Sequence, residues 1–170
     1  MSALPVTDEE PHREPAATLT RRVFSLVCRV EVNIRASAPT IWHILTDAES
    51  YPRWNSTIAR IDGEIREGTR LRLHVPGTER TFTPRVSGVT PNQCMTWTGG
   101  VAAIFTGVRT FVLRSRSDGT TDFFMDERFS GAMLPLIARV LPDFRPVFAR
   151  FASDLKWEAE RPPARATVGT

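Results

Sequence analysis

Two residues of opposite charge, Arg109 and Glu127, lie in strand-like runs that a short turn connects. The turn contains Asp118-Gly119, a dipeptide that favours tight hairpins. If Ser115 pairs with Thr121 across this turn, the antiparallel register places Arg109 opposite Glu127 on the same face of the hairpin. The spacing therefore predicts an ion pair, and these two residues are the candidate catalytic residues of the chain.

The same register gives matched apolar pairs, which is the reason to prefer it. Leu113 opposes Phe123, and Phe111 opposes Met125. A slip by one residue would turn charged side chains inward and Phe111 outward. We therefore expect this face to be the concave, core-facing one, with the ion pair at the wall of a cavity and partly out of water.

Two interpretations of the pair stay open. In the functional one, Arg109 hydrogen-bonds a carbonyl, phenolate or carboxylate of an otherwise apolar ligand, while Glu127 orients Arg109 or acts as an acid or base. In the structural one, the pair closes the narrow end of the cavity and rigidifies the sheet. A buried ion pair is often close to neutral for stability, so stability alone does not account for it.

The elements that must position these residues follow from the hydrophobic pattern. A long alternating strand starts at Val23, with its even-numbered side chains in the core, and a short helix follows, with Ser37 as N-cap and Pro39 in its first turn. Turn residues then separate a meander of antiparallel strands. The seven predicted strands are 23–34, 58–61, 71–75, 81–89, 94–98, 106–114 and 121–130.

A helical period replaces the alternation from Leu134 to about Glu160. Its apolar face is aromatic, because Phe144, Phe148 and Phe151 fall at i, i+4 and i+7. Two prolines inside this stretch predict a break at 141–143, after which Asp143 caps the second segment.

This order of elements and a set of short signals resemble the START-like (SRPBCC) superfamily over residues 24 to 160. The signals are Ala38-Pro39 with Trp42 and Asp47, Trp54-Asn55, Gly63, Gly68, Pro84 with Val86, Trp97 with Gly99-Gly100, Gly107 with Phe111, Gly119-Thr120-Thr121 and Glu127-Arg128-Phe129-Ser130-Gly131. The resemblance implies an α+β helix-grip fold of the START and Bet v 1 type. In it, a curved seven-stranded antiparallel sheet surrounds a long C-terminal helix.

The resemblance also implies a function. Relatives include pollen allergens, plant hormone receptors, polyketide cyclase-like proteins and quinone-binding chaperones. We expect a protein that binds a hydrophobic or aromatic small molecule, such as a lipid, quinone or polyketide, between sheet and helix. One alternative is a cofactor-independent polyketide aromatase/cyclase that promotes cyclisation and dehydration, and a second is a co-chaperone-like interaction module.

Apolar and aromatic side chains would form the walls of that cavity. Tyr51, Trp54 and Trp97 are amphipathic aromatics that could stack on a flat ligand or donate a hydrogen bond to it. The apolar loop 99–105 is either a gate over the cavity mouth or a segment that packs against the C-terminal helix. The expected ligand-binding residues are Tyr51, Trp54, Trp97, Ile104, Phe105, Phe111, Phe123, Met125, Phe144, Phe148 and Phe151.

Composition restricts the remaining function classes. A chain of 170 residues with 41% hydrophobic content fits one domain at 21–161, and we expect disordered tails at 1–20 and 162–170. Cys28 and Cys94 are expected to be reduced core thiols, and the three histidines are scattered, so we expect neither a metal nor a cofactor. A net charge of +3 with dispersed arginines argues against nucleic-acid binding. The absence of a long apolar segment predicts a cytoplasmic protein without an integral membrane segment.

Overall fold

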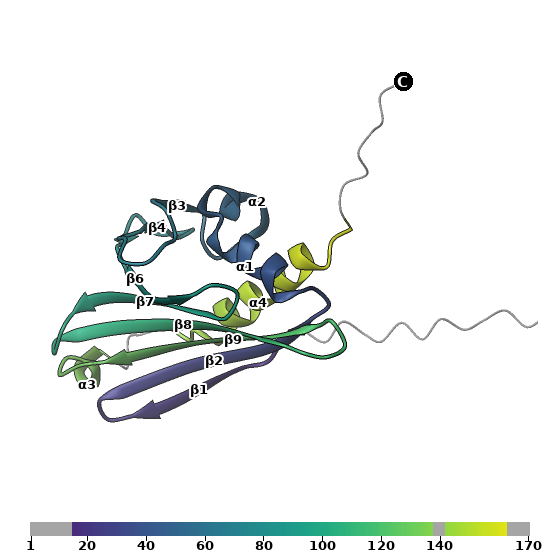
Figure 1. Cartoon of the computed structure of the whole chain (residues 1–170). Coiled ribbons are helices and arrows are strands. Elements are labelled where there is room, and N and C mark those ends of the chain that lie inside the picture. Colours follow the sequence, from purple (N-terminus) through teal and green to yellow (C-terminus); the bar gives the residue numbers. More distant parts are fainter. Residues whose placement is uncertain (1–14, 138–141, 163–170) are drawn as a thin grey trace, which may run out of the picture.

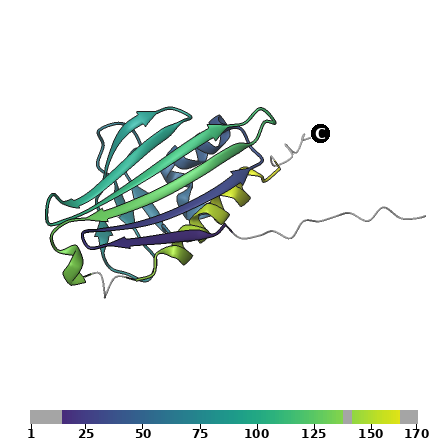
Figure 2. The same cartoon turned by 90° about the horizontal axis from the view of Figure 1, so that it is seen from below.

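The computed structural model describes residues 15–137 and 142–162. Its main layer is a six-stranded antiparallel sheet in the order β1-β2-β9-β8-β7-β6, and the C-terminal helix α4 packs across one face of it (Figures 1 and 2). The strands of this sheet are β1 (Ala17–Arg22), β2 (Ser25–Ile34), β6 (Arg85–Thr90), β7 (Cys94–Val101), β8 (Phe105–Ser115) and β9 (Thr121–Ser130). The predicted α+β class, with a helix against an antiparallel sheet, is confirmed.

The first helix begins where its capping residue predicts. Ser37 Oγ accepts a hydrogen bond from the backbone N–H of Thr40 at 3.3 Å, as an N-cap does. Asp143 Oδ1 accepts one from Arg145 N at 3.0 Å just before α4, so Asp143 lies one residue before the N-cap position, which Phe144 occupies, and the predicted cap is displaced by one residue. Residue 141, where the predicted break starts, lies outside the described residues. The helices are α1 (Ala38–Thr46), the 3-10 turn η1 (Ala48–Ser50), α2 (Tyr51–Trp54), α3 (Leu134–Ile137) and α4 (Arg145–Ala159).

The predicted count of seven strands is wrong, because the described part of the chain contains nine. A second, three-stranded sheet consists of β3 (Arg60–Asp62), β4 (Arg72–His74) and β5 (Thr81–Phe82). The expected strand 81–89 is two strands, β5 and β6, in different sheets. Pro84, which lies between them, cannot donate a backbone hydrogen bond, so a single strand does not continue through it.

The other additional strand is β1, which corrects the predicted boundary of the N-terminal tail. Residues 17–20 were expected to be disordered, but β1 pairs with β2 from Ala17 to Arg22. Only Ala17 and Leu19 give this strand an apolar side, which is too short a pattern to recognise in the sequence. Phe24 was expected on the core face of a strand, yet it lies in the β1–β2 turn and is 61% exposed.

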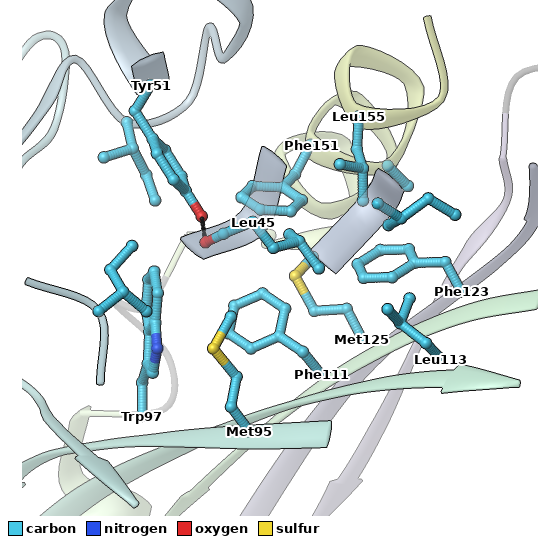
Figure 3. Packing of buried hydrophobic residues seen from close by; sticks show 14 of the residues in the cluster. Leu45, Tyr51, Met95, Trp97, Phe111, Leu113, Phe123, Met125, Phe151 and Leu155 are labelled. Carbon is cyan, nitrogen blue, oxygen red and sulfur yellow. Dashed lines mark hydrogen bonds between the residues drawn. The ribbon is translucent and has the colours of Figure 1, made fainter. Parts of the chain in front are cut away.

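The core lies between the concave face of the main sheet and α4. Phe148, Phe151 and Leu155 of α4 are buried, as the helical period predicts. The ring of Phe151 lies 6.0 Å from that of Phe111 and 6.4 Å from that of Phe123, so helix and sheet interlock through aromatic side chains (Figure 3). No helix in the described ranges is long and apolar enough to span a bilayer.

The buried ring of Phe151 predicts a strong effect on stability. We expect Phe151→Ala to lower the free energy of unfolding by about 3–5 kcal/mol, since it leaves a cavity among large rings. Trp157→Ala is the matched control, because Trp157 lies on the same helix but is 60% exposed, and it should cost less than about 1 kcal/mol. Urea unfolding measures both, and equal losses would show that α4 is not held through this contact.

Candidate functional site

The predicted register of the β8–β9 hairpin is confirmed. Ser115 pairs with Thr121, and Arg109 pairs with Glu127. The strands on either side extend this row, since β7 places Trp97 opposite Arg109 and β2 places Cys28 opposite Glu127. A cysteine, an ion pair and an indole therefore form one row across the sheet.

The ion pair is close and mostly buried. Arg109 Nη2 lies 2.6 Å from Glu127 Oε2, and Arg109 Nε donates to the same oxygen at 3.1 Å. The side chains are only 19% and 15% exposed, and the guanidinium carbon lies 5.2 Å from the centre of the Phe148 ring. A guanidinium carries five N–H groups, so this contact leaves Arg109 with donors for another acceptor.

The space beside the carboxylate leaves little room for any residue larger than glycine. Gly107 lies opposite Phe129 in the next row of the hairpin. A Cβ atom at this position would lie 3.3 Å from Glu127 Oε1 and 3.3 Å from the Phe129 ring. A larger residue here would therefore press on the carboxylate, so Gly107 helps to set the position of Glu127.

Trp97 contributes an unpaired donor to the same row. Its side chain is 2% exposed and packs edge-on against Phe111 at 4.9 Å between ring centres. Within the described residues its Nε1 atom is buried and has no hydrogen-bond partner. Leaving a buried donor unpaired costs about 1–3 kcal/mol, so this indole N–H is a group that gains from any acceptor brought to the row.

The predicted apolar walls do converge between sheet and helix. Phe111, Phe123 and Met125 come from β8 and β9, and α4 adds Phe148 and Phe151, all of them buried. They belong to one buried cluster, in which Phe111, Phe123, Met125 and Phe151 lie together between sheet and helix (Figure 3). Two hollows of the described structure lie elsewhere, one on the outside of β1 and β2 and one beside the outer face of α4.

Tyr51 and Trp54 are buried close to Phe151, but their polar groups are already used. Tyr51 Oη donates to the backbone oxygen of Leu45 at 3.0 Å (Figure 3). Trp54 Nε1 donates to Ser50 Oγ at 3.2 Å, and its ring lies 5.7 Å from that of Phe151. Neither residue has a free donor for a ligand, so only their ring faces can contact one.

The segment 99–105 is a β-hairpin rather than a loop. β7 continues to Val101 and β8 starts at Phe105, so only three residues form the turn. The backbone oxygens of Ala103 and Ile104 accept hydrogen bonds from Ala132 and Met133, each at 3.0 Å, which fixes the turn. These hydrogen bonds tie the turn to the stretch after β9, and a role as a gate stays a prediction.

The last three predicted ligand-binding residues lie near this hairpin. Ile104 is 53% exposed in the turn. Phe105 stacks on Phe129 at 5.7 Å, and Phe129 stacks on Phe144 at 4.8 Å, in a smaller cluster next to the main core. The structure does not bring Ile104 into the row of the ion pair. Contact of any of these residues with a ligand stays a prediction.

Sequence reasoning placed Cys28 in the core but did not assign it to this site. Cys28 is fully buried opposite Glu127, and burial, followed by the nearby Asp143 and Glu127 carboxylates, raises the pKa of its thiol to about 11. The thiol is therefore neutral at ordinary pH. Alternation in β2 was the available signal, because it turns even-numbered residues inward.

The remaining described residues offer no metal centre. No group of three or more His, Cys, Asp or Glu side chains comes together in residues 15–137 and 142–162. His74 contacts Asp62 across β3 and β4 at 2.9 Å, and both side chains are partly exposed on the small sheet.

A family model described as polyketide cyclase / dehydrase and lipid transport matches residues 26–160. The match extends from the second residue of β2 to the end of α4. The chain belongs to this family. No curated protein is similar enough in sequence to give a match.

Several solved structures share this fold. A START superfamily protein from Mycobacterium smegmatis is 21% identical, with 79% of this chain and 97% of that chain covered and a TM-score of 0.58. CalU16 from Micromonospora echinospora is 14% identical, with 89% and 88% covered and a TM-score of 0.59. A norcoclaurine synthase from a Thalictrum species is 14% identical, with 82% and 97% covered and a TM-score of 0.63. At these identities the similarity shows a shared fold alone.

The ion pair predicts coupled effects on stability. Arg109→Met leaves the Glu127 carboxylate without its partner in an apolar site, so we expect a loss of about 2–4 kcal/mol. The double variant Arg109→Met/Glu127→Leu removes both charges and should unfold within about 1 kcal/mol of the wild type. Urea unfolding of the variants measures this coupling.

The exposed pair of Arg66 and Glu64 provides the control. These side chains are 69% and 77% exposed, so Arg66→Met should change stability by less than about 0.5 kcal/mol. If the Arg109 double variant loses as much as the sum of its two single changes, the pair is not coupled and the burial argument fails.

The raised pKa of Cys28 predicts its reactivity. In a Cys94→Ala variant, Cys28 should resist thiol reagents below pH 9.0, its ordinary pKa, until the protein unfolds, whereas Cys94 in a Cys28→Ala variant should react in the folded protein. Between pH 9.0 and about 11 the Cys28 thiol ionises in the unfolded chain but not in the folded protein. Its contribution to the free energy of unfolding is therefore fully present below pH 9.0 and is lost as the pH rises to about 11. Equal modification rates in the two folded variants would contradict this prediction.

Proposed function

We propose that this protein binds a flat hydrophobic small molecule that carries one polar oxygen, in the space between the concave face of the sheet and α4. The observation that carries the proposal is the row in which Arg109 and Trp97 present hydrogen-bond donors among apolar side chains. In this proposal the apolar walls supply affinity, and the oxygen of the ligand accepts from Arg109, Trp97 or both.

The charges of the row support a ligand with an acceptor rather than a pure hydrocarbon. Arg109 is held by Glu127 through two nitrogens, which fixes the direction of its guanidinium. Trp97 Nε1 is buried without a partner in the described part of the chain. A carbonyl, phenolate or carboxylate oxygen would pair with both donors, whereas an apolar ligand would pair with neither.

Binding must be accompanied by movement of side chains, because the interior is packed. Phe111, Phe148 and Phe151 occupy the space that a ligand would need. In this proposal the ligand approaches through the hollow beside α4. It has a volume of about 240 Å³ and is lined by Ser56, Thr57, Val75, Pro76, Pro146, Val147 and Arg150.

Catalysis is the second candidate function. In it, Glu127 would take a proton from a poly-keto chain folded against the sheet, and Arg109 would stabilise the enolate that forms. The carboxylate next to a guanidinium favours this reading. A similar structure, DynU16, is described as a putative protein of the dynemicin biosynthetic locus.

We place either activity in the cytoplasm, since both cysteines are free thiols and Cys94 is partly exposed.

Paired probes test the binding proposal. Naphthoate is flat and carries a carboxylate, and naphthalene lacks it. We expect naphthoate to quench the tryptophan fluorescence of the wild type, and we expect Arg109→Gln to weaken naphthoate binding about tenfold while naphthalene binding stays unchanged. Arg116→Gln is the control, because Arg116 pairs with Asp122 at 3.0 Å at the far end of the hairpin. An equal loss for both probes, or none, would contradict the role of Arg109.

Glu127→Gln distinguishes binding from catalysis. A binding protein should keep its affinity for naphthoate within a few fold and show no reaction with a synthetic triketone. An enzyme should convert the triketone to an aromatic product, followed by absorbance, and Glu127→Gln should abolish this turnover while binding persists.

A further inference from the structure

One end of the main sheet carries most of the exposed large apolar side chains of the described structure. Nine such residues are exposed, and six of them lie in three chain segments at this end. The segments are the β1–β2 turn, the β7–β8 turn and the stretch after β9. We call this surface the apolar end, and it consists of Val23 (69% exposed), Phe24 (61%), Val101 (61%), Ile104 (53%), Met133 (40%) and Leu136 (73%).

The strand register shows that these three segments are neighbours. Arg22 pairs with Ser25, Ser25 with Ser130, Ser130 with Thr106, and Thr106 with Gly100, so the last row of the sheet connects all of them. In both views the two hairpin turns and α3 lie together at the left end of the molecule (Figures 1 and 2).

Backbone contacts hold the apolar end in shape. The hydrogen bonds from Ala132 and Met133 to the β7–β8 turn join two of the three segments. Gly131 makes this approach possible, because its φ is +137° and a Cβ atom there would lie 2.3 Å from the backbone oxygen of Ile104. The exposed side chains therefore project from fixed backbone.

A basic surface adjoins the apolar end on the outer face of the sheet. Arg22, Arg29 and Arg128 line a hollow of about 270 Å³ together with Thr18, Thr20, Ser25 and Val27, and no acidic residue lines it. Among the described residues, none of the three arginines forms a salt bridge. Asp126 is the cross-strand neighbour of Arg29, but their side chains form no salt bridge. Arg22 directly precedes Val23, so the positive charge reaches the apolar tips.

We propose that the apolar end docks the protein on an anionic membrane surface. The side chains of the three tips enter the boundary between headgroups and acyl chains, and Arg22 and Arg128 bind the anionic headgroups beside them. Exposed apolar side chains on three neighbouring segments, beside arginines without a salt bridge in the described structure, match a lipid surface in which charged headgroups lie next to acyl chains. The proposal rests on this surface alone and is independent of the proposed ligand site.

Sedimentation of the full chain with vesicles tests this docking. We expect binding to vesicles of equal parts phosphatidylcholine and phosphatidylserine, little binding to phosphatidylcholine alone, and weakening by salt. Phe24→Ser/Ile104→Ser should lower the partition coefficient by about tenfold or more, since it removes two inserting side chains. Arg22→Gln/Arg128→Gln should lower it about tenfold on the anionic vesicles only.

Matched controls lie on the small sheet. Phe82→Ser removes a 50% exposed aromatic residue and Arg72→Gln an exposed arginine, and both should leave partitioning within about twofold of the wild type. Near-ultraviolet circular dichroism confirms that each variant is folded. Arg109→Gln should keep vesicle binding, which separates this result from that of the ligand assay.

Three results would overturn the docking proposal. The first is a wild-type protein that stays in the supernatant with anionic vesicles at low salt. The second is a folded Phe24→Ser/Ile104→Ser variant that binds as well as the wild type. The third is a wild-type protein that does not bind vesicles and that light scattering shows to be a dimer, while the Phe24→Ser/Ile104→Ser variant is a monomer. The apolar end would then join two copies of the chain.

Discussion

The antiparallel pairing of β8 with β9 determines which side chains the protein encloses. Their register turns Phe111, Phe123 and Met125 toward α4, and with the same periodicity it must turn Arg109 and Glu127 toward the helix too. A shift by one residue would expose the aromatic residues and bury charges elsewhere. The aromatic core and the charged pair are thus consequences of one register. The same register determines the apolar surface against which α4 packs.

Enclosing a charged pair has a cost in lost hydration. The guanidinium and the carboxylate lose most of their hydration, and their mutual attraction only roughly restores it. The indole N–H of Trp97, buried without a partner in the described structure, adds a second unfavourable group to the same row. Hydrophobic packing around Phe148 and Phe151 is what allows both to persist. The ion pair and the indole N–H thus place buried polar groups side by side on adjacent strands, within an otherwise apolar surface.

Much of this architecture could be predicted from the sequence where patterns were long. Alternation in β2, β8 and β9 and the helical period of α4 gave the correct faces, and the Asp118-Gly119 turn gave the register that places Arg109 beside Glu127. Short elements were missed, because β1 has only Ala17 and Leu19 on its apolar side and β5 has two residues. The fixed β7–β8 turn was also unpredictable, since it depends on contacts with Ala132 and Met133, which are far away in sequence.

The packed interior also has a consequence for rates. Phe111, Phe148 and Phe151 must leave their contacts before a molecule can enter between sheet and helix, so the protein that accepts a ligand is a minor, opened population. Apparent affinity then equals the intrinsic affinity multiplied by the fraction of open molecules. Association would approach a maximum rate at high ligand concentration, the rate at which the rings separate. A substitution that loosens α4 would accelerate association while it lowers the melting temperature, so the same aromatic contacts would govern both folding stability and the speed of recognition.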